Sequence, residues 1–249
     1  MCRLLLLLNT KNNLKKIILF LSQSIHLHKY TPLLNNSRDA TNHKDGFGLS
    51  WYNNKIINFY KSPLIFNKDT KLDNVLNSIS SNIILGHIRQ KTESNTSYNN
   101  THPFYFDNQI FIHNGRIKDF NKNKNIVLKY ININYIKYIK GHTDSEFLFY
   151  LFLSFNDIHG CLKKAMKEMF NLFRFLNIEL GANIIFGNMD YIIITRYLIY
   201  NQNEYVNKQK PASLYIDYSD GIIISSEPIT DNWHLIKENS ILLFDIKKI

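Results

Sequence analysis

Met1-Cys2-Arg3-Leu4-Leu5-Leu6-Leu7-Leu8 opens the chain, and these residues decide both the expected fold and the expected chemistry. Residues 2–8 are typical of a short buried strand, although a leucine-rich run of this length also suits a helix. Cys2 stands directly behind the initiator methionine. If Met1 is removed, Cys2 carries a free thiol and a free α-amine, so one residue holds both a nucleophile and a base.

A cysteine thiol needs such a base, because its ordinary pKa of about 8.5 leaves only a small fraction as thiolate at neutral pH. An α-amine that titrates at about 8 can take the proton, directly or through a water. Any residue can follow a start codon, so the position of Cys2 alone does not establish a catalytic part. The other motifs of the chain must decide.

The length of 249 residues is enough for one large domain with a substantial core, or for two small ones. The sequence has only 5 prolines and 9 glycines, and no linker rich in Pro, Ser or Gly divides it. We therefore expect a single domain over residues 1–249. We also expect Met1 to be removed, because the residue that follows it is as small as Cys.

The net charge of +10 raises the alternative of nucleic-acid binding. The lysines are scattered among Asn and Ile residues along the whole chain, which favours a general compositional bias over a binding surface. The densest basic segment, residues 118–140, interleaves lysines with tyrosines and is the one to test for contact with RNA or DNA. Nucleic acid is therefore not the expected partner.

Two cysteines, Cys2 and Cys161, cannot form a disulfide framework and suit a reducing compartment. We expect Cys161 to be a small buried side chain within a helix. The run Leu4 to Leu8 is too short for a signal-peptide core or a membrane span, and Asn9, Thr10 and Lys11 close it. These features indicate a cytoplasmic protein with no membrane association.

Hydrophobic periodicity predicts a mixture of helices and strands. Asn53-Asn54-Lys55 separates two strand-like runs and signals a hairpin. Helices in the middle and strands at both ends indicate a layered α+β domain and not a βαβ repeat. The expected helices cover residues 12–29, 72–79, 144–154 and 157–177, and the expected strands cover 2–8, 46–52, 56–60, 83–88, 109–113, 183–186, 191–195, 213–218, 222–226 and 241–246.

Polar motifs recur where the expected strands end, which is where sites are usually built. The motifs are Asp45-Gly46-Phe47-Gly48, Gly86-His87-Ile88-Arg89 with Thr92, Thr101-His102-Pro103-Phe104, His113-Asn114-Gly115, Thr143-Asp144-Ser145-Glu146 and Ser226-Glu227-Pro228. With Met1-Cys2-Arg3 they run in order through nearly the whole chain, and this order resembles the class II glutamine amidotransferases. These are N-terminal-nucleophile (Ntn) hydrolases, and the resemblance extends to their stand-alone subgroup, which includes γ-glutamyl hydrolases of thiol metabolism.

The resemblance implies a four-layer αββα sandwich, in which two antiparallel sheets lie between helical layers. It implies an enzyme that hydrolyses the γ-amide of glutamine or another γ-glutamyl compound through a thioester on Cys2. The α-amine acts first as base and then as acid. No cofactor or metal is required, and the spacing of His43, His87, His102 and His113 is not specific for a metal.

The resemblance also assigns the site residues. Asn114 and the backbone N–H of Gly115 would stabilise the oxyanion, although Asn-Gly also suits a type I′ turn. Arg89 would bind the α-carboxylate of the substrate, with a surface ion pair as its alternative. Asp144 would receive the α-ammonium and also cap a helix. The remaining two residues, Thr92 and His102, would support the pocket.

None of these residues is expected to contact the leaving group, so the motifs do not distinguish glutamine from larger γ-glutamyl amides as the substrate. Because the glutaminase-like region occupies nearly all 249 residues, either a separate synthase subunit receives the ammonia or the protein acts alone. The competing hypothesis is a catalytically degenerate binding protein of the same fold, with a basic surface that binds nucleic acid.

Overall fold

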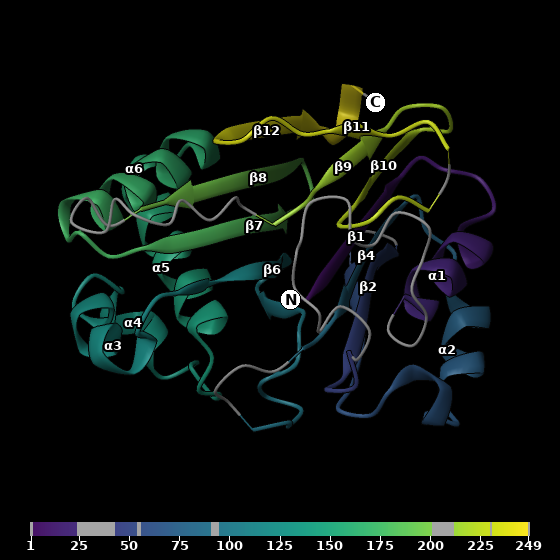
Figure 1. The fold of residues 1–249 in the computed structure, drawn as a ribbon, viewed down its shortest axis with the longest axis horizontal. Coiled ribbons are helices and arrows are strands. Elements are labelled where there is room, and N and C mark those ends of the chain that lie inside the picture. Colours follow the sequence, from purple (N-terminus) through teal and green to yellow (C-terminus); the bar gives the residue numbers. More distant parts are fainter. Residues whose placement is uncertain are drawn as a thin grey trace.

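A computed structural model describes residues 2–23, 43–53, 56–90, 95–200, 212–229 and 231–248. Two antiparallel sheets lie face to face, with helices over both outer faces (Figure 1). The expected αββα arrangement is therefore confirmed.

The first sheet has seven strands in the order β11-β9-β10-β1-β4-β2-β3. Its central strand β1 is buried along its whole length and pairs with β4 on one side and β10 on the other. The strand expected at residues 2–8 and the hairpin of β2 with β3 are confirmed. The strands are β1 (Arg3–Leu8), β2 (Phe47–Asn53), β3 (Ile56–Ser62), β4 (Ile83–Ile88), β9 (Tyr215–Asp217), β10 (Ile222–Ser225) and β11 (His234–Leu235).

The second sheet has five strands in the order β12-β8-β7-β6-β5. Its strand β6 is longer than expected and contains Asn114 and Gly115, which pair with residues of β7. The type I′ turn is therefore not what Asn114-Gly115 forms. The strands are β5 (Phe104–Phe106), β6 (Gln109–Ile117), β7 (Leu180–Gly187), β8 (Tyr191–Ile199) and β12 (Ser240–Asp245).

Helices α1 (Asn13–Ser22) and α2 (Leu72–Ser78) cover the outer face of the seven-stranded sheet, where Ile17 and Phe20 pack against Leu5 and Leu7 of β1. Helix α1 ends earlier than expected, and residues 24–29 of the expected helix lie outside the described residues. The five-stranded sheet is covered by α3 (Phe120–Leu128), α4 (Ile133–Ile136), α5 (Asp144–His159) and α6 (Leu162–Phe175).

Alternate leucines of β1 face the two sides of its sheet, which explains why the whole run is apolar. Leu5 and Leu7 face α1, whereas Leu4, Leu6 and Leu8 face the other sheet and pack in one core with Ile110 and Ile112 of β6. That inter-sheet core positions the end of β1 against the middle of β6.

The expectation for Cys161 is wrong. Helix α5 continues to His159 and ends at Gly160, whose φ of 59° lies in the left-handed region that glycine tolerates. Cys161 then precedes α6 as its N-cap residue, and its side chain is exposed. The helix expected over 157–177 therefore begins too early, because residues 157–159 belong to α5 and α6 begins only at Leu162.

None of the helices in the described part of the chain combines the length and the apolar character that a membrane crossing requires.

Candidate active site

Two rows of side chains in the inter-sheet core each end on a polar residue. The row Leu8, Leu6, Leu4 of β1 leads by strand alternation to Cys2, and the row Ile110, Ile112 of β6 leads to Asn114. His87 of β4 pairs with Leu4 and donates its Nε2–H to the carbonyl oxygen of His113 at 3.2 Å, so the two polar ends lie at the same side of the core.

The Cys2 thiol is half-buried and lies against the backbone of Gln90. The Gln90 N–H donates to Sγ at 3.4 Å, and the thiol donates to the Gln90 carbonyl at 3.6 Å. Burial raises the pKa of Cys2, while the Gln90 N–H and the positive charge of Arg89 act in the opposite direction. The thiol therefore needs a base to become a nucleophile.

Gly115 exposes its backbone at the edge of β6. The Lys118 N–H donates to Glu179 at 3.0 Å, so even-numbered residues of this part of β6 bond to β7 and odd-numbered ones point to the opposite edge. At that edge the His113 carbonyl accepts from the His87 ring, and the Ile117 N–H donates to the Asp144 carboxylate at 2.8 Å. The Gly115 N–H points to the same edge, between the His113 carbonyl and the Ile117 N–H. Because the pairing of β6 with β5 ends at Phe111, no described strand covers the edge at Gly115.

Arg89 follows the last residue of β4 and is buried, with 4% of its surface exposed. Its guanidinium donates to the backbone carbonyls of Asp45 and Asn95, at 3.4 and 3.3 Å. A surface ion pair is therefore not the role of this side chain. Burial lowers the pKa of this guanidinium, and the negative charge of Asp45 acts in the opposite direction and raises it.

Asp144 is the first residue of α5, and the expectation that it caps this helix is wrong. Thr143 is the N-cap, because its backbone is extended and its Oγ1 accepts from the Glu146 N–H. The Asp144 carboxylate accepts instead from the N–H groups of Ile117 and Ser145, both at 2.8 Å. Its charge still lies at the helix N-terminus, where it is stabilising.

His102 is buried, and its ring contacts His87, which in turn bonds to His113 of β6. Its ring stacks on His87 at 3.9 Å between centroids and meets the edge of Phe104 at 4.6 Å. Burial lowers the pKa of His87 to about 3 and lowers that of His102 well below its ordinary value. Both rings are thus neutral, and among the described residues no three His, Cys, Asp or Glu side chains are arranged to hold a metal ion. The other expected pocket residue, Thr92, lies outside the described residues.

A buried ion pair that the sequence did not predict anchors the start of β1. The Arg3 guanidinium lies 3.7 Å from the Glu227 carboxylate, and both side chains are buried. Ser226 completes the anchor, since its Oγ accepts from the Leu4 N–H at 2.9 Å and its N–H donates to the Leu4 carbonyl at 3.0 Å. The motif Ser226-Glu227-Pro228 therefore fixes the backbone next to Cys2.

We expect Glu227→Gln to change how stability depends on pH. Burial raises the pKa of Glu227 from 4.5 to about 7, although Arg3 and Ser213 oppose the shift. The folded state therefore holds the proton more tightly, so the contribution of Glu227 to stability is fully present below pH 4.5 and is lost as the pH rises to about 7. Relative to the variant, the wild type should lose up to about 3 kcal/mol between pH 4 and 8, measured by urea unfolding. A constant difference would contradict this pKa.

Two antiparallel sheets between helical layers, with a cysteine at the start of a central strand, define an Ntn-hydrolase fold. The family profile described as "Glutamine amidotransferases class-II" matches residues 18–246. The chain therefore belongs to the class II glutamine amidotransferases.

Individual relatives agree with this family. The probable glutamine amidotransferase DUG3 of Saccharomyces cerevisiae is 26% identical, over 80% of this chain and 68% of its own length. The uncharacterized protein MJ1515 of Methanocaldococcus jannaschii is also 26% identical, over 82% of this chain and 62% of its own length. The chain thus spans about two thirds of these relatives.

Solved structures share the fold. A glutamine aminotransferase class-II domain protein from Silicibacter pomeroyi superposes with a TM-score of 0.65 at 22% identity, covering 99% of this chain and 96% of that one. The glutamine phosphoribosylpyrophosphate amidotransferase of B. subtilis gives a TM-score of 0.64 at 13% identity, covering 99% of this chain and 49% of that one.

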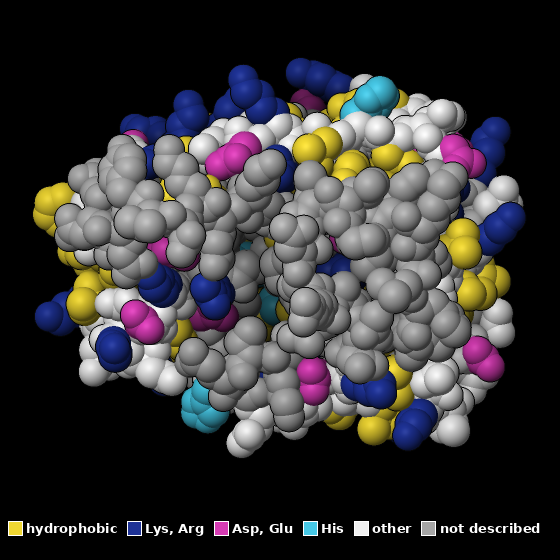
Figure 2. Space-filling model, in the orientation of Figure 1, with side chains coloured by type: hydrophobic (Ala, Val, Ile, Leu, Met, Phe, Trp, Pro, Cys, Tyr) yellow, Lys and Arg dark blue, Asp and Glu magenta, His cyan; other side chains and the backbone are white. Residues whose placement is uncertain are grey.

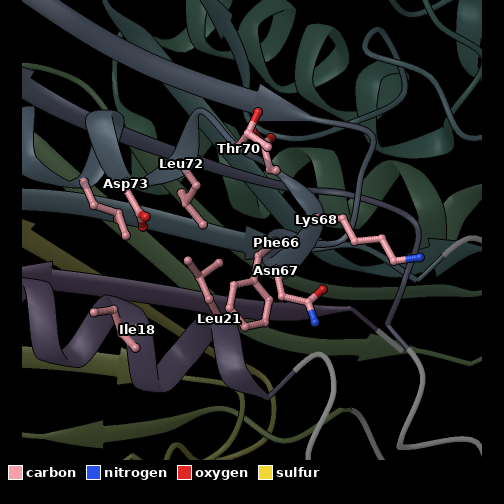
Figure 3. Close-up of a pocket in the computed structure, with 10 residues that line it drawn as sticks. Ile18, Leu21, Phe66, Asn67, Lys68, Thr70, Leu72 and Asp73 are labelled. Atoms are coloured by element: carbon pink, nitrogen blue, oxygen red, sulfur yellow. The ribbon is translucent and has the colours of Figure 1, made fainter.

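A surface pocket of about 410 Å³ lies between α1, α2 and the short helix η1 (Phe66–Lys68), and Figure 3 shows Leu21, Phe66 and Leu72 among its lining. These helices cover the outer face of the seven-stranded sheet, whereas Cys2 continues the row on the inner face. The pocket is therefore separate from the Cys2 site.

Among the described residues on the face shown in Figure 2, Lys and Arg side chains are spread out and interspersed with acidic ones. Within residues 118–140, Lys118 pairs with Glu179 at 3.7 Å, and the Lys124 ammonium lies 4.9 Å from the Phe147 ring centre. These two lysines are used within the fold, which weakens the case for a nucleic-acid surface.

Proposed function

We propose that the processed protein hydrolyses the γ-amide of glutamine or of another γ-glutamyl compound, with Cys2 as nucleophile. The observation that carries this proposal is the bond from His87, the strand partner of Leu4 in β1, to His113 of β6, because Cys2 lies two residues from Leu4 and Gly115 two residues from His113. The buried cation of Arg89 and the carboxylate of Asp144 lie close enough to this thiol for their charges to act on its pKa.

In the first half of the reaction, the α-amine of Cys2 takes the thiol proton and Sγ attacks the γ-carbonyl carbon. The Asn114 amide and the Gly115 N–H stabilise the resulting oxyanion. The carbon–nitrogen bond then breaks, the protonated α-amine gives its proton to the departing nitrogen, and a γ-glutamyl thioester remains. Water, deprotonated by the same amine, attacks the thioester and releases glutamate and the Cys2 thiol.

Arg89 and Asp144 hold the amino-acid head of the substrate through its α-carboxylate and α-ammonium. These groups are common to every γ-glutamyl compound, so Arg89 and Asp144 select the γ-glutamyl half and do not discriminate between departing amines. Ammonia released from glutamine passes to a separate synthase subunit or to solvent.

The test is glutamate release from glutamine and from glutathione by protein whose Met1 has been removed, as verified by intact mass. Release from either compound is expected, and the ratio of the two rates identifies the preferred leaving group. The degenerate binding protein predicts release from neither, together with nucleic-acid binding that weakens steeply with salt.

We expect Arg89→Lys to raise the KM for glutamine about tenfold or more with a smaller change in kcat. An ammonium group cannot form the two parallel bonds by which a guanidinium holds a carboxylate. Steady-state kinetics measures both constants, with Arg174→Lys at an exposed position of α6 as the matched control. An unchanged KM would remove Arg89 from the carboxylate site.

A further inference from the structure

The two charges proposed to hold the amino-acid head come from different layers of the molecule. Arg89 follows β4 of the seven-stranded sheet, whereas Asp144 starts α5, which covers the five-stranded sheet. Neither sheet fixes the spacing between a guanidinium and a carboxylate that must bind the two ends of one small molecule. A direct connection between their two segments would do so.

The Asn100 side chain makes such a connection. Its Nδ2 donates at 2.9 Å to the Asn95 carbonyl, which also accepts from the Arg89 guanidinium at 3.3 Å. Its Oδ1 accepts from the His142 N–H at 2.9 Å, two residues before Asp144. Asn100 is 3% exposed, so losing either bond leaves a polar atom of its buried amide unpaired.

Residues 140–143, which receive the bond from Asn100 at His142, are held firmly against α5. Glu146 accepts from the N–H groups of Lys140 and Gly141 at 2.8 and 2.7 Å, and Thr143 caps the helix. Gly141 packs so closely that a Cβ there would lie 2.5 Å from Asn100 Oδ1. A shift of the Asn100 amide would therefore move the segment that carries Asp144.

We infer that Asn100 is a positioning residue that sets the distance between Arg89 and Asp144, and thereby the affinity for the amino-acid head. The inference rests on the proposed function, because it takes Arg89 and Asp144 as the two groups that hold this head. Asn100 acts through them and does not touch the reacting atoms, so it should affect binding of the head more than the chemistry at Cys2.

Asn100→Ala tests this inference, and Asn99→Ala, a neighbouring exposed asparagine, is its matched control. We expect Asn100→Ala to raise the KM for glutamine about tenfold and to change kcat by less than about threefold. Calorimetry should show about tenfold weaker binding of L-glutamate, which carries the same head. Alkylation of Cys2 by iodoacetamide, which lacks that head, should proceed at the wild-type rate. The control should match the wild type throughout.

Asn100→Asp keeps the side-chain size and the acceptor for His142, but it cannot donate to Asn95. Asn100→Asp should also weaken glutamate binding, and it provides the test of the Asn100 inference if the alanine variant does not fold. Unchanged glutamate binding in a folded variant, or an equal loss in iodoacetamide reactivity, overturns the inference. If the wild type binds glutamate but hydrolyses neither glutamine nor glutathione, the proposed hydrolysis fails and the binding comparison still decides the inference. If it does not bind glutamate, both fail.

Discussion

Cys2→Ala is expected to abolish glutamate release, with kcat lowered at least about a thousandfold, because the variant has no atom that can form the thioester. Glutamate release from glutamine under saturating conditions measures the loss. Cys161→Ala is the matched control, since Cys161 is exposed at the N-terminus of α6 and should be dispensable. Residual activity above about one per cent in Cys2→Ala would contradict a nucleophilic Cys2.

An alanine inserted between Met1 and Cys2 separates the thiol from the amine. The thiol persists, but the terminal amine moves to another residue, so activity should fall about as far as in Cys2→Ala. Two buried histidines near the site are already engaged, since His87 and His113 donate from Nε2 to backbone carbonyls, and the Cys2 thiol donates to the Gln90 carbonyl. Full activity in the insertion variant would show that the base lies elsewhere.

Gly115→Ala is expected to lower kcat about a hundredfold to a thousandfold, the usual cost of losing one oxyanion donor. A Cβ at this position would lie 1.9 Å from the Gly181 carbonyl oxygen and 2.5 Å from His113 Nε2. Strand β6 must therefore shift, which moves the Gly115 N–H away from the developing oxyanion. The measurement is kcat for glutamate release, together with a urea unfolding curve that reports the lost stability.

Gly181→Ala is the matched control for that variant. Gly181 faces the same strand pair from β7, but a Cβ there meets its nearest atom at 3.7 Å, which is ordinary contact. Asn114→Ala separates strain from the loss of a donor, since it removes the other donor and adds no atom. It should cost about the same in kcat with a smaller loss of stability. Wild-type kcat in Gly115→Ala would contradict an oxyanion site at this edge.

The sequence predicts those elements whose burial is complete or whose periodicity is strong. The leucine run of β1 and the apolar β4 are buried on both faces, and the spacing of Leu72 and Leu76 marks α2. Helix α3 was missed because only Phe120 and Val127 of its nine residues are buried, among lysines and asparagines that give no clear period. The three-residue strand β5 is too short for alternation to show.

The motifs predict which residues form the site but not what holds them in place. The Arg3–Glu227 pair, the His87 bond to His113 and the double contact of Asn100 join segments that are far apart in the sequence. No local spacing encodes such contacts, because tertiary packing alone brings the partners together. For the same reason the choice of Thr143 over Asp144 as helix cap depends on Ile117, whose N–H binds the Asp144 carboxylate.

The intact mass of the wild-type protein, mixed with glutamine and quenched in acid within one turnover, decides whether Cys2 forms the thioester. We expect a species that lacks Met1 and is heavier by one γ-glutamyl group, with the added mass on the peptide that begins at Cys2. Cys2→Ala should acquire no such mass. Glutamate release without any adduct on Cys2, or by protein that still carries Met1, would contradict the proposed mechanism.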